Sequence, residues 1–400
     1  MKKRVFVTMF PICEGLGITK DVGQTPQVMA NCYGYESYLV TYNNGDDYES
    51  WCDKYAPDIK KVIFLHKSGH NTELLDELRF IVKHAREIDV LHTFHIGIKH
   101  LICLWVYKIL NPKGISYLRL DIDFQTLEYY SNIEPWKKKF IQFLHKGTDI
   151  VSAESSETCK QYEEIFGIRP ICVPIGFVDI DGIKNINCTH KSALDMGDSS
   201  NKDSSNDTSI CKEKIIMTAG RLGTKQKATE ILLEAFAKTQ NTIDWKLICA
   251  GPISEDFNNY MYNFKSLHAD VMDRIIFTGN ITNKAELYSY MERASIFAMP
   301  SRWGGSETVC VEAISKGCYL LMSDQIPPFK EYTNNGEFGM QIPVDDVDAW
   351  ANGIDTAIAC YDKNHFNAYR ASQYGKKTFN WKTILGVLEN EINKVRDIKV

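Results

Sequence analysis

The stretch that decides the fold runs from a strand through a loop into a helix, Ile296-Phe-Ala-Met-Pro-Ser-Arg-Trp-Gly-Gly-Ser-Glu-Thr-Val-Cys-Val-Glu312-Ala-Ile-Ser-Lys-Gly317. Residues 296–299 are apolar, the loop after them is small and polar, and Glu312 lies about one turn inside the helix. A helix N-terminus carries free N–H groups and a partial positive charge, so it binds phosphate well. Glu312 would repel phosphate but can accept hydrogen bonds from sugar hydroxyls. The stretch therefore predicts a nucleotide-sugar site, with diphosphate at the helix tip and ribose on Glu312.

The same alternation of strands and helices fills both halves of the chain. Four hundred residues exceed what one hydrophobic core usually organises, and the alternation predicts parallel sheets with crossover helices. We expect an α/β fold of two Rossmann-like, doubly wound domains facing each other across a cleft, with ligands at the carboxyl ends of the strands. The predicted strands span 5–9, 37–41, 62–65, 90–93, 117–120, 150–153, 171–173, 215–218, 246–250, 275–278, 296–299 and 319–323. The predicted helices include 71–87, 99–110, 156–166 (with Ser155 as N-cap), 228–239, 284–293 and 347–361.

A change of composition divides the two halves. Residues 196–209 are polar and nearly free of hydrophobic side chains, so they cannot bury enough surface to offset their ordering entropy. We therefore expect domains at 1–180 and 214–380, joined by a flexible loop or linker at 181–213. The closing segment, 381–400, is amphipathic, and we expect it to pack back on the first domain.

Bulk composition excludes several classes of protein. The net charge of −5 gives no general reason to expect nucleic-acid binding. The twelve cysteines are scattered singly, without Cys-x-x-Cys pairs or zinc-ligand spacing, which is typical of reduced thiols in a cytosolic protein. The N-terminus lacks a signal-peptide pattern. The longest apolar segment, 101–110, is far shorter than the roughly 20 residues needed to span a bilayer.

A basic loop follows the first strand of the second half and reads Gly220-Arg221-Leu222-Gly223-Thr-Lys225-Gln-Lys227. In an α/β sheet this is a phosphate position. Arg221 can direct two N–H bonds at a phosphate, and Lys227 can add a mobile point charge. A solvated basic loop is the equal alternative. Turns at 250–252 and 277–281 end the next two strands, so the three turns should share one edge of the sheet.

Polar residues also end strands in the first half. The turn 14–17, with Gly17, is either a plain tight turn or a place where backbone approaches a ligand closely. Asp121 and Asp123 flank one residue, so in an extended segment both would face one side and could hold hydroxyls or a cation. Helix capping is the alternative, favoured for Asp123. His92 and His95 lack an evident third ligand nearby, so we expect no metal site.

The segment 135–146 is basic, aromatic and long enough for a helix. Such a helix could lie on an anionic membrane surface. A solvated helix with a buried aromatic face is the favoured interpretation.

Several individually weak motifs, taken in order, resemble those of the retaining nucleotide-sugar glycosyltransferases of family 4, which have the GT-B architecture. The resemblance covers most of the chain and is strongest between Ala219 and Asp324. The matching motifs are Gly220-Arg221-Leu222, Lys227, 232–236, 277–279, Pro300-Ser301 and 312–317, with weaker matches at 174–179 and 379–381.

The resemblance implies a role for each matching residue. Arg221 and Lys227 would bind the donor diphosphate and assist its departure, and Asp121 takes the place where many relatives carry a histidine close to the transferred sugar. Glu312 would hold the ribose, and Gly17 would match a glycine loop of the acceptor-side first domain. The expected catalytic residues are thus Arg221, Lys227 and Asp121, and the expected donor-binding residues are Gly17, Asn280 and Ile281 near the base, Glu307, Thr308 and Val309 near the phosphates, and Glu312.

One position departs from the family pattern. The family usually carries a glutamate eight residues before the one matching Glu312, and that position here is Gly304. Glu307 could supply the carboxylate from within the loop, with a different spacing. This departure leaves the identity of the donor sugar open.

The sequence thus predicts a retaining transferase that moves a hexose from a UDP- or GDP-type sugar, without a further cofactor, to a hydroxyl of a saccharide or lipid-linked saccharide. Such an enzyme would serve polysaccharide or glycoconjugate synthesis in the cytoplasm, with a peripheral membrane contact at the inner face left open. One alternative is a catalytically silent subunit that only binds nucleotide sugar or scaffolds a partner, which Gly304 favours. A dinucleotide oxidoreductase is a second alternative, but no Gly-x-Gly-x-x-Gly follows any strand.

Overall fold

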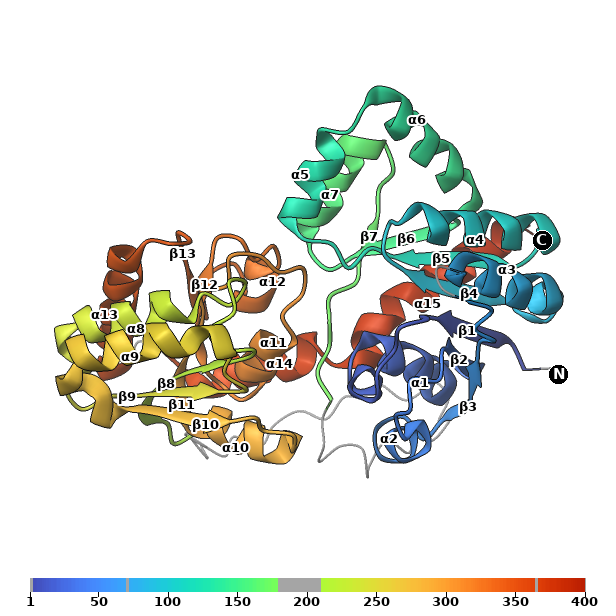
Figure 1. Cartoon of the computed structure of the whole chain (residues 1–400). Helices are drawn as coiled ribbons and strands as arrows, with labels where there is room; N and C mark the ends of the chain where they lie inside the picture. Colours follow the sequence, from blue (N-terminus) through green and yellow to red (C-terminus); the bar gives the residue numbers. More distant parts are fainter. Residues whose placement is uncertain (1–2, 70–71, 179–209, 364–365, 400) are drawn as a thin grey trace, which may run out of the picture.

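The computed structural model describes residues 3–69, 72–178, 210–363 and 366–399, and within them the chain forms two α/β domains (Figure 1). Each domain is built on a parallel sheet with helices on both faces, which confirms the predicted fold class. Most of the predicted linker, residues 181–209, lies outside the described residues.

The first domain is organised around a sheet of seven strands in the order β3-β2-β1-β4-β5-β6-β7 among the described residues. Neighbouring strands are parallel throughout. The strands are β1 (Val5–Met9), β2 (Glu36–Thr41), β3 (Ile59–Phe64), β4 (Val90–Phe94), β5 (Ile115–Arg119), β6 (Ile150–Ala153) and β7 (Ile171–Cys172).

The helices of the first domain connect these strands. They are α1 (Asp21–Tyr33), α2 (Tyr48–Tyr55), α3 (Glu73–His84), α4 (Ile98–Leu110), α5 (Phe124–Ser131), α6 (Pro135–Leu144) and α7 (Ser156–Phe166). The predicted helix 71–87 is too long, because α3 ends at His84 and a 3-10 turn, Ala85–Glu87, follows. Asn111 explains this ending, since its amide donates to the carbonyls of Ala85 and Ile88 at 2.9 and 2.8 Å.

Alternate residues of the strands face two separate cores. Phe6, Val90 and Tyr117 point to a core shared with α1, whereas Val7, Leu91 and Leu118 point to a core shared with α3, α4 and α6. This alternation is the period of a strand, in which successive side chains face opposite sides of the sheet. Helices α3, α4 and α6 therefore form one layer on one face, and α1 covers the other.

The second domain repeats the design with six strands in the order β10-β9-β8-β11-β12-β13 among the described residues. The strands are β8 (Glu213–Ala219), β9 (Lys246–Ala250), β10 (Ile275–Gly279), β11 (Ala294–Met299), β12 (Tyr319–Ser323) and β13 (Gly339–Ile342). The helices are α8 (Thr229–Lys238), α9 (Asn258–Leu267), α10 (Lys284–Arg293), α11 (Thr308–Ser315), α12 (Phe329–Thr333), α13 (Val347–Asp362) and α14 (Ala368–Thr378).

The chain crosses between the domains at two places that touch each other. Phe177, on the way out of the first domain, donates its N–H to the carbonyl of Phe379 on the way back, at 3.3 Å. Helix α15 (Trp381–Lys399) then packs against α1 (Figure 1). The hydroxyl of Tyr35 donates to Glu389 of α15 at 2.9 Å.

None of the helices in the described parts of the chain is long and apolar enough to cross a bilayer.

Candidate active site

Three glycines end neighbouring strands of the second sheet. The N–H of Gly220 donates to Ala250 O and the N–H of Gly251 donates to Gly279 O, both at 2.9 Å. Gly251 has φ +136°, and a Cβ there would lie 1.9 Å from Gly220 O. Only glycine permits so close a backbone approach. The predicted turns thus share one edge, at the carboxyl ends of β8, β9 and β10.

Lys227 lies against this edge. Its side chain is 14% exposed and runs beside Gly220, where a Cβ would meet Lys227 Cε at 3.4 Å. Its Nζ donates to both carboxylate oxygens of Glu307 at 2.8 Å. Arg221 is more exposed, and its Nη2 donates to Gln226 Oε1 at 2.8 Å. Both predicted cations therefore sit on the loop after β8, with Lys227 held in place by a carboxylate.

The loop after β8 is bound to the loop after β11. The N–H of Arg302 donates to Gln226 O at 2.8 Å, and the Gln226 amide donates to Trp303 O at 3.1 Å. The two loops are neighbours because β8 pairs with β11. These bonds hold the cationic loop next to the start of α11.

The tip of α11 has the free donors that the sequence predicts. Glu307 is the N-cap residue, but its side chain makes no capping bond, since it is bound to Lys227. Within the described parts of the chain, the N–H groups of Thr308 and Val309 have no hydrogen-bond partner. Unpaired N–H groups beside a lysine make an anion-binding tip.

Gly304 and Glu307 share one space. A Cβ on Gly304 would lie 2.4 Å from Glu307 Oε1, and Glu307 is itself largely buried. The carboxylate of Glu307 therefore occupies the volume into which a side chain at position 304 would project. The loop supplies a carboxylate there from three residues further along the chain.

Glu312 is buried further inside α11, with its side chain 1% exposed. The ammonium group of Lys284 and the hydroxyl of Tyr288, at 3.3 Å, both donate to its Oε1. Its Oε2 is buried and has no hydrogen-bond partner within the described residues. Lys284 and Tyr288 belong to α10, which begins just after the predicted base contacts, exposed Asn280 and half-buried Ile281.

A buried ionic cluster lies at the edge of the first sheet that faces the second domain. Arg119 is fully buried at the end of β5, with its Nε 2.8 Å from Asp21 Oδ2 and 3.4 Å from Glu154 Oε1. Although burial opposes its charge, these carboxylates hold the pKa of Arg119 above its ordinary value. Burial raises the pKa of Glu154 to about 8, with Arg119 opposing the shift and Asp121 and Asp21 adding to it.

Asp121 and Asp123 do not share a face, so the expectation based on an extended segment is wrong. Asp121 has φ +41°, which turns the backbone out of the strand, and its N–H donates to Glu154 Oε1 at 3.1 Å. Its carboxylate is exposed and lies 4.0 Å from His95 Nδ1. Asp123 instead caps α5 by accepting from the N–H of Thr126 at 2.8 Å.

Gly17 lies in a 3-10 turn, Gly15–Thr19, that leads into α1. Its N–H donates to Glu14 O at 2.8 Å, and a Cβ on it would lie 3.0 Å from Cys13 Sγ. Asp21, at the start of α1, joins this turn to the Arg119 cluster and so to Asp121. The two predicted site elements of the first domain are thus neighbours.

The domains meet where these two halves of the site lie. A Cβ on Gly305, in the loop before α11, would lie 3.2 Å from the backbone oxygen of Ile122, next to Asp121. Nearby, the N–H of Ser156 donates to Glu331 Oε1 at 2.7 Å. The loop that carries Glu307 therefore faces the strand end that carries Asp121.

Several residues of the site were not predicted. Arg119, Glu154 and Asp21 stabilise the turn at Asp121, while Gln226 and Lys284 hold the cationic loop and Glu312. Arg119 alone gave a sequence signal, since a charge inside an apolar strand requires buried partners. The partners of Glu312 and Lys227 come from other elements, and no local pattern marks them.

Comparison with known proteins finds similarity to glycosyltransferases. Residues 200–377 match the family described as glycosyl transferases, group 1. The chain is 23% identical over 221 residues to the N-acetylgalactosamine-N,N'-diacetylbacillosaminyl-diphospho-undecaprenol 4-alpha-N-acetylgalactosaminyltransferase of Campylobacter jejuni, which covers 55% of this chain and 54% of that protein. It is 27% identical over 168 residues to the GDP-mannose:cellobiosyl-diphosphopolyprenol alpha-mannosyltransferase of Xanthomonas oryzae, covering 42% of this chain and 43% of that one. The matched region thus spans about half the length of these relatives.

A solved structure shows the same architecture over the whole chain. Anabaena Alr3699/HepE in complex with UDP and glucose superposes with a TM-score of 0.69 at 16% identity, covering 98% of this chain and 100% of that one. The chain therefore has the GT-B fold, and residues 200–377 match the glycosyl transferase group 1 model. The family match and the two curated relatives support a glycosyltransferase.

Proposed function

We propose that this chain, whose residues 200–377 match the glycosyl transferase group 1 model, is a retaining hexosyltransferase of family 4. Its donor is a nucleoside-diphosphate sugar of the UDP or GDP type, and its acceptor is a saccharide hydroxyl. The observation that carries the proposal is Lys227, held 2.8 Å from Glu307 at the tip of α11, beside unpaired N–H groups. This arrangement suits a diphosphate that leaves with its charge neutralised.

The proposed chemistry is mainly electrostatic. As the bond between sugar and diphosphate breaks, negative charge develops on the leaving group, and donors already in place stabilise it. Lys227 and the N–H groups of Thr308 and Val309 supply those donors, with Arg221 at the exposed side. The buried Oε2 of Glu312, which lacks a partner among the described residues, accepts from a ribose hydroxyl.

Asp121 is proposed to face the transferred sugar. It lies at a strand end of the first domain, across from the loop that carries Glu307. In this proposal the acceptor hydroxyl attacks the sugar on the same face that the diphosphate leaves, so the anomeric configuration is retained. Contact between the two domains excludes water, which otherwise competes as acceptor.

Glu307 is proposed to replace the glutamate that family members carry at the position of Gly304. Its carboxylate already occupies the space beside Gly304 and holds Lys227. On donor binding, the carboxylate would accept from sugar hydroxyls while Lys227 turns to the diphosphate. This proposal disfavours the silent-subunit alternative, because the loop retains a carboxylate despite Gly304.

The acceptor is proposed to be a saccharide on a polyprenyl diphosphate. The Campylobacter and Xanthomonas relatives both have acceptors of this kind in their names, diphospho-undecaprenol and diphosphopolyprenol. Such an acceptor lies at a bilayer surface, so the proposal includes a cytoplasmic enzyme in peripheral contact with a membrane.

The proposal is tested by screening UDP- and GDP-sugars for thermal stabilisation of the chain, then measuring sugar transfer from the donor that binds. We expect Arg221→Ala to lower kcat/KM by about 100-fold, because one lost donor in a preorganised site costs that order of magnitude. Glu307→Gln should lower transfer while the melting temperature changes little. Near-normal transfer by Arg221→Ala, or no stabilisation by any nucleotide sugar, would argue against the assignment.

A further inference from the structure

The helix layer α3, α4 and α6 carries apolar side chains on its outer side. The inner side of this layer already packs on the sheet through residues such as Ile81, Leu104 and Ile141. Helix α4 contacts both α3 and α6, so the three outer sides adjoin one another. Exposed apolar patches that extend over several elements are uncommon and mark interaction sites.

Helix α6 presents a stripe of three aromatic residues to solvent. Trp136 is 65% exposed, and Phe140 and Phe143 are about half exposed. Their spacing of four and three residues places them on one side of the helix. The expectation of a buried aromatic face is therefore wrong, because Ile141 and Leu144 fill the core instead.

Helix α4 continues this surface. Its outer positions Ile98, Ile102, Trp105 and Ile109 follow the same helical spacing, and Ile98 and Ile109 are exposed. The ring centroids of Trp105 and Phe143 lie 6.2 Å apart, so the stripes of α4 and α6 meet.

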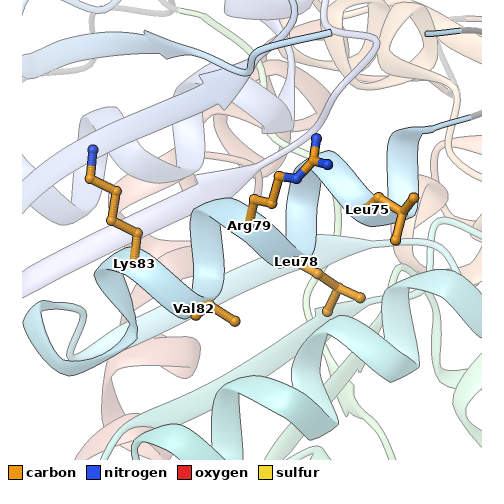
Figure 2. Close-up of a pocket in the computed structure, with 5 residues that line it drawn as sticks. All are labelled: Leu75, Leu78, Arg79, Val82 and Lys83. Carbon is orange, nitrogen blue, oxygen red and sulfur yellow. The ribbon is translucent and has the colours of Figure 1, made fainter. Parts of the chain in front are cut away.

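Helix α3 adds the third stripe, which lines a shallow groove (Figure 2). Leu75, Leu78 and Val82 point one way in this view, and Arg79 and Lys83, which line the same groove, point another. Val82 is 64% exposed and Leu75 is 55% exposed. Helix α3 thus has two apolar surfaces. One is buried against the sheet, and the other is an exposed stripe beside the cations Arg79 and Lys83.

Cations without a carboxylate partner accompany the three stripes. Within the described residues, Lys83, Lys139 and Lys146 form no ion pair, and Lys146 Nζ lies 5.7 Å from the Phe143 ring. The acidic residues of α3 and the N-cap residue of α6 are already engaged: Glu73 with Lys99, Asp76 with Arg79, Glu77 with Cys103, and Glu134 with Lys137. The surface therefore combines free positive charge with aromatic and aliphatic side chains.

We propose that the outer side of α3, α4 and α6 is a single membrane-docking surface that binds an anionic lipid bilayer. Aromatic residues favour the boundary between headgroups and acyl chains, and each lysine near anionic lipid adds attraction. The proposal deepens the membrane part of the proposed function. The sequence indicated a membrane contact only for the segment that forms α6. The proposal adds α3 and α4 to it.

The test is sedimentation of the full chain with vesicles of phosphatidylglycerol and phosphatidylcholine, or of phosphatidylcholine alone. We expect binding only to the anionic vesicles, weakened by salt. Trp136→Ser on α6 and Val82→Ser on α3 should each weaken binding about tenfold, and Lys139→Gln with Lys146→Gln about 30-fold. Leu267→Ser and Lys265→Gln, on α9 of the second domain, are matched controls that should bind as the unaltered chain does.

Three outcomes would overturn the proposal. They are equal binding to both kinds of vesicle, loss on Trp136→Ser without loss on Val82→Ser, and a concentration-dependent dimer abolished by the same variants, which would make the surface a contact between two copies. Thermal stabilisation of the chain by the nucleotide-sugar donor, measured without lipid, should be the same in all these variants. Failure of the membrane proposal is therefore distinguishable from failure of the transferase assignment.

Discussion

Gly251 lies where the backbones at two strand ends nearly touch. Substituting this glycine therefore tests how closely the two strand ends pack at the site. Gly251→Ala should lower the free energy of unfolding by about 3 kcal/mol or more, because a Cβ would collide with Gly220 O and φ is positive. Gly279→Ala is the matched control, since Gly279 also has positive φ but open space around it, and should cost about 1 kcal/mol. Denaturant titration measures both, and equal losses would contradict the close approach.

Glu154 gives the first domain a pH-dependent stability. Its pKa is raised from 4.5 to about 8, so between these values the folded state holds a proton that the unfolded state releases. Stability from this group is therefore lost as pH rises from about 4.5 to about 8.

Glu154→Gln, which mimics the protonated acid, should hardly change the melting temperature at pH 5 and should raise it at pH 9. The exposed acid variant Glu255→Gln serves as the control and should show no such trend. A melting temperature lowered by Glu154→Gln at pH 9 would show that the ionised group stabilises Arg119 instead.

At the residue scale, the sequence could predict side chains whose chemistry depends on their own element. Lys227 lies beside a strand-end glycine as expected, because strand, loop and helix follow directly in the chain. Its carboxylate partner is 80 positions away, and only the pairing of β8 with β11 brings it near. Asp121 was misplaced relative to Asp123 because its positive φ has no sequence signal, unlike that of a glycine.

Asp121, which follows β5, and Asp123, which is the N-cap of α5, are predicted to have different roles. Asp123→Ala should lower the free energy of unfolding by about 1 kcal/mol, because it removes the N-cap of α5, and should leave kcat near normal. Asp121→Asn should do the reverse, with a large loss of kcat and an unchanged melting temperature. Loss of activity in Asp123→Ala alone would reverse the proposed roles.

Among the elements, several strands and helices were predicted with the right bounds, whereas the edge strand β13 was not predicted. Strands β1, β6, β9 and β12 and helices α7 and α10 have the predicted bounds, and Ser155 caps α7 by accepting from Thr158 at 3.0 Å. Strand β13 lies at the sheet edge, and its sequence Gly-Met-Gln-Ile has no continuous apolar run, so its pattern does not separate it from a loop.

At the scale of the whole molecule, the two sheets follow from the alternation of elements, but the meeting of the domains does not. Gly305 approaches Ile122, and Ser156 binds Glu331, across a separation of well over a hundred residues. Such contacts depend on how the two crossing segments at Phe177 and Phe379 orient the domains. No periodicity within one segment encodes that orientation.

The measurement that tests the central claim most directly is calorimetric titration of the full chain with UDP and GDP, compared with the free nucleosides. We predict that Lys227→Met weakens binding of the preferred diphosphate at least tenfold without changing binding of its nucleoside, because the proposed role of Lys227 is to bind the diphosphate and not the nucleoside. Lys225→Met, in the same loop, should bind as the unaltered chain does. Equal diphosphate affinity in the Lys227→Met and Lys225→Met variants would contradict the account.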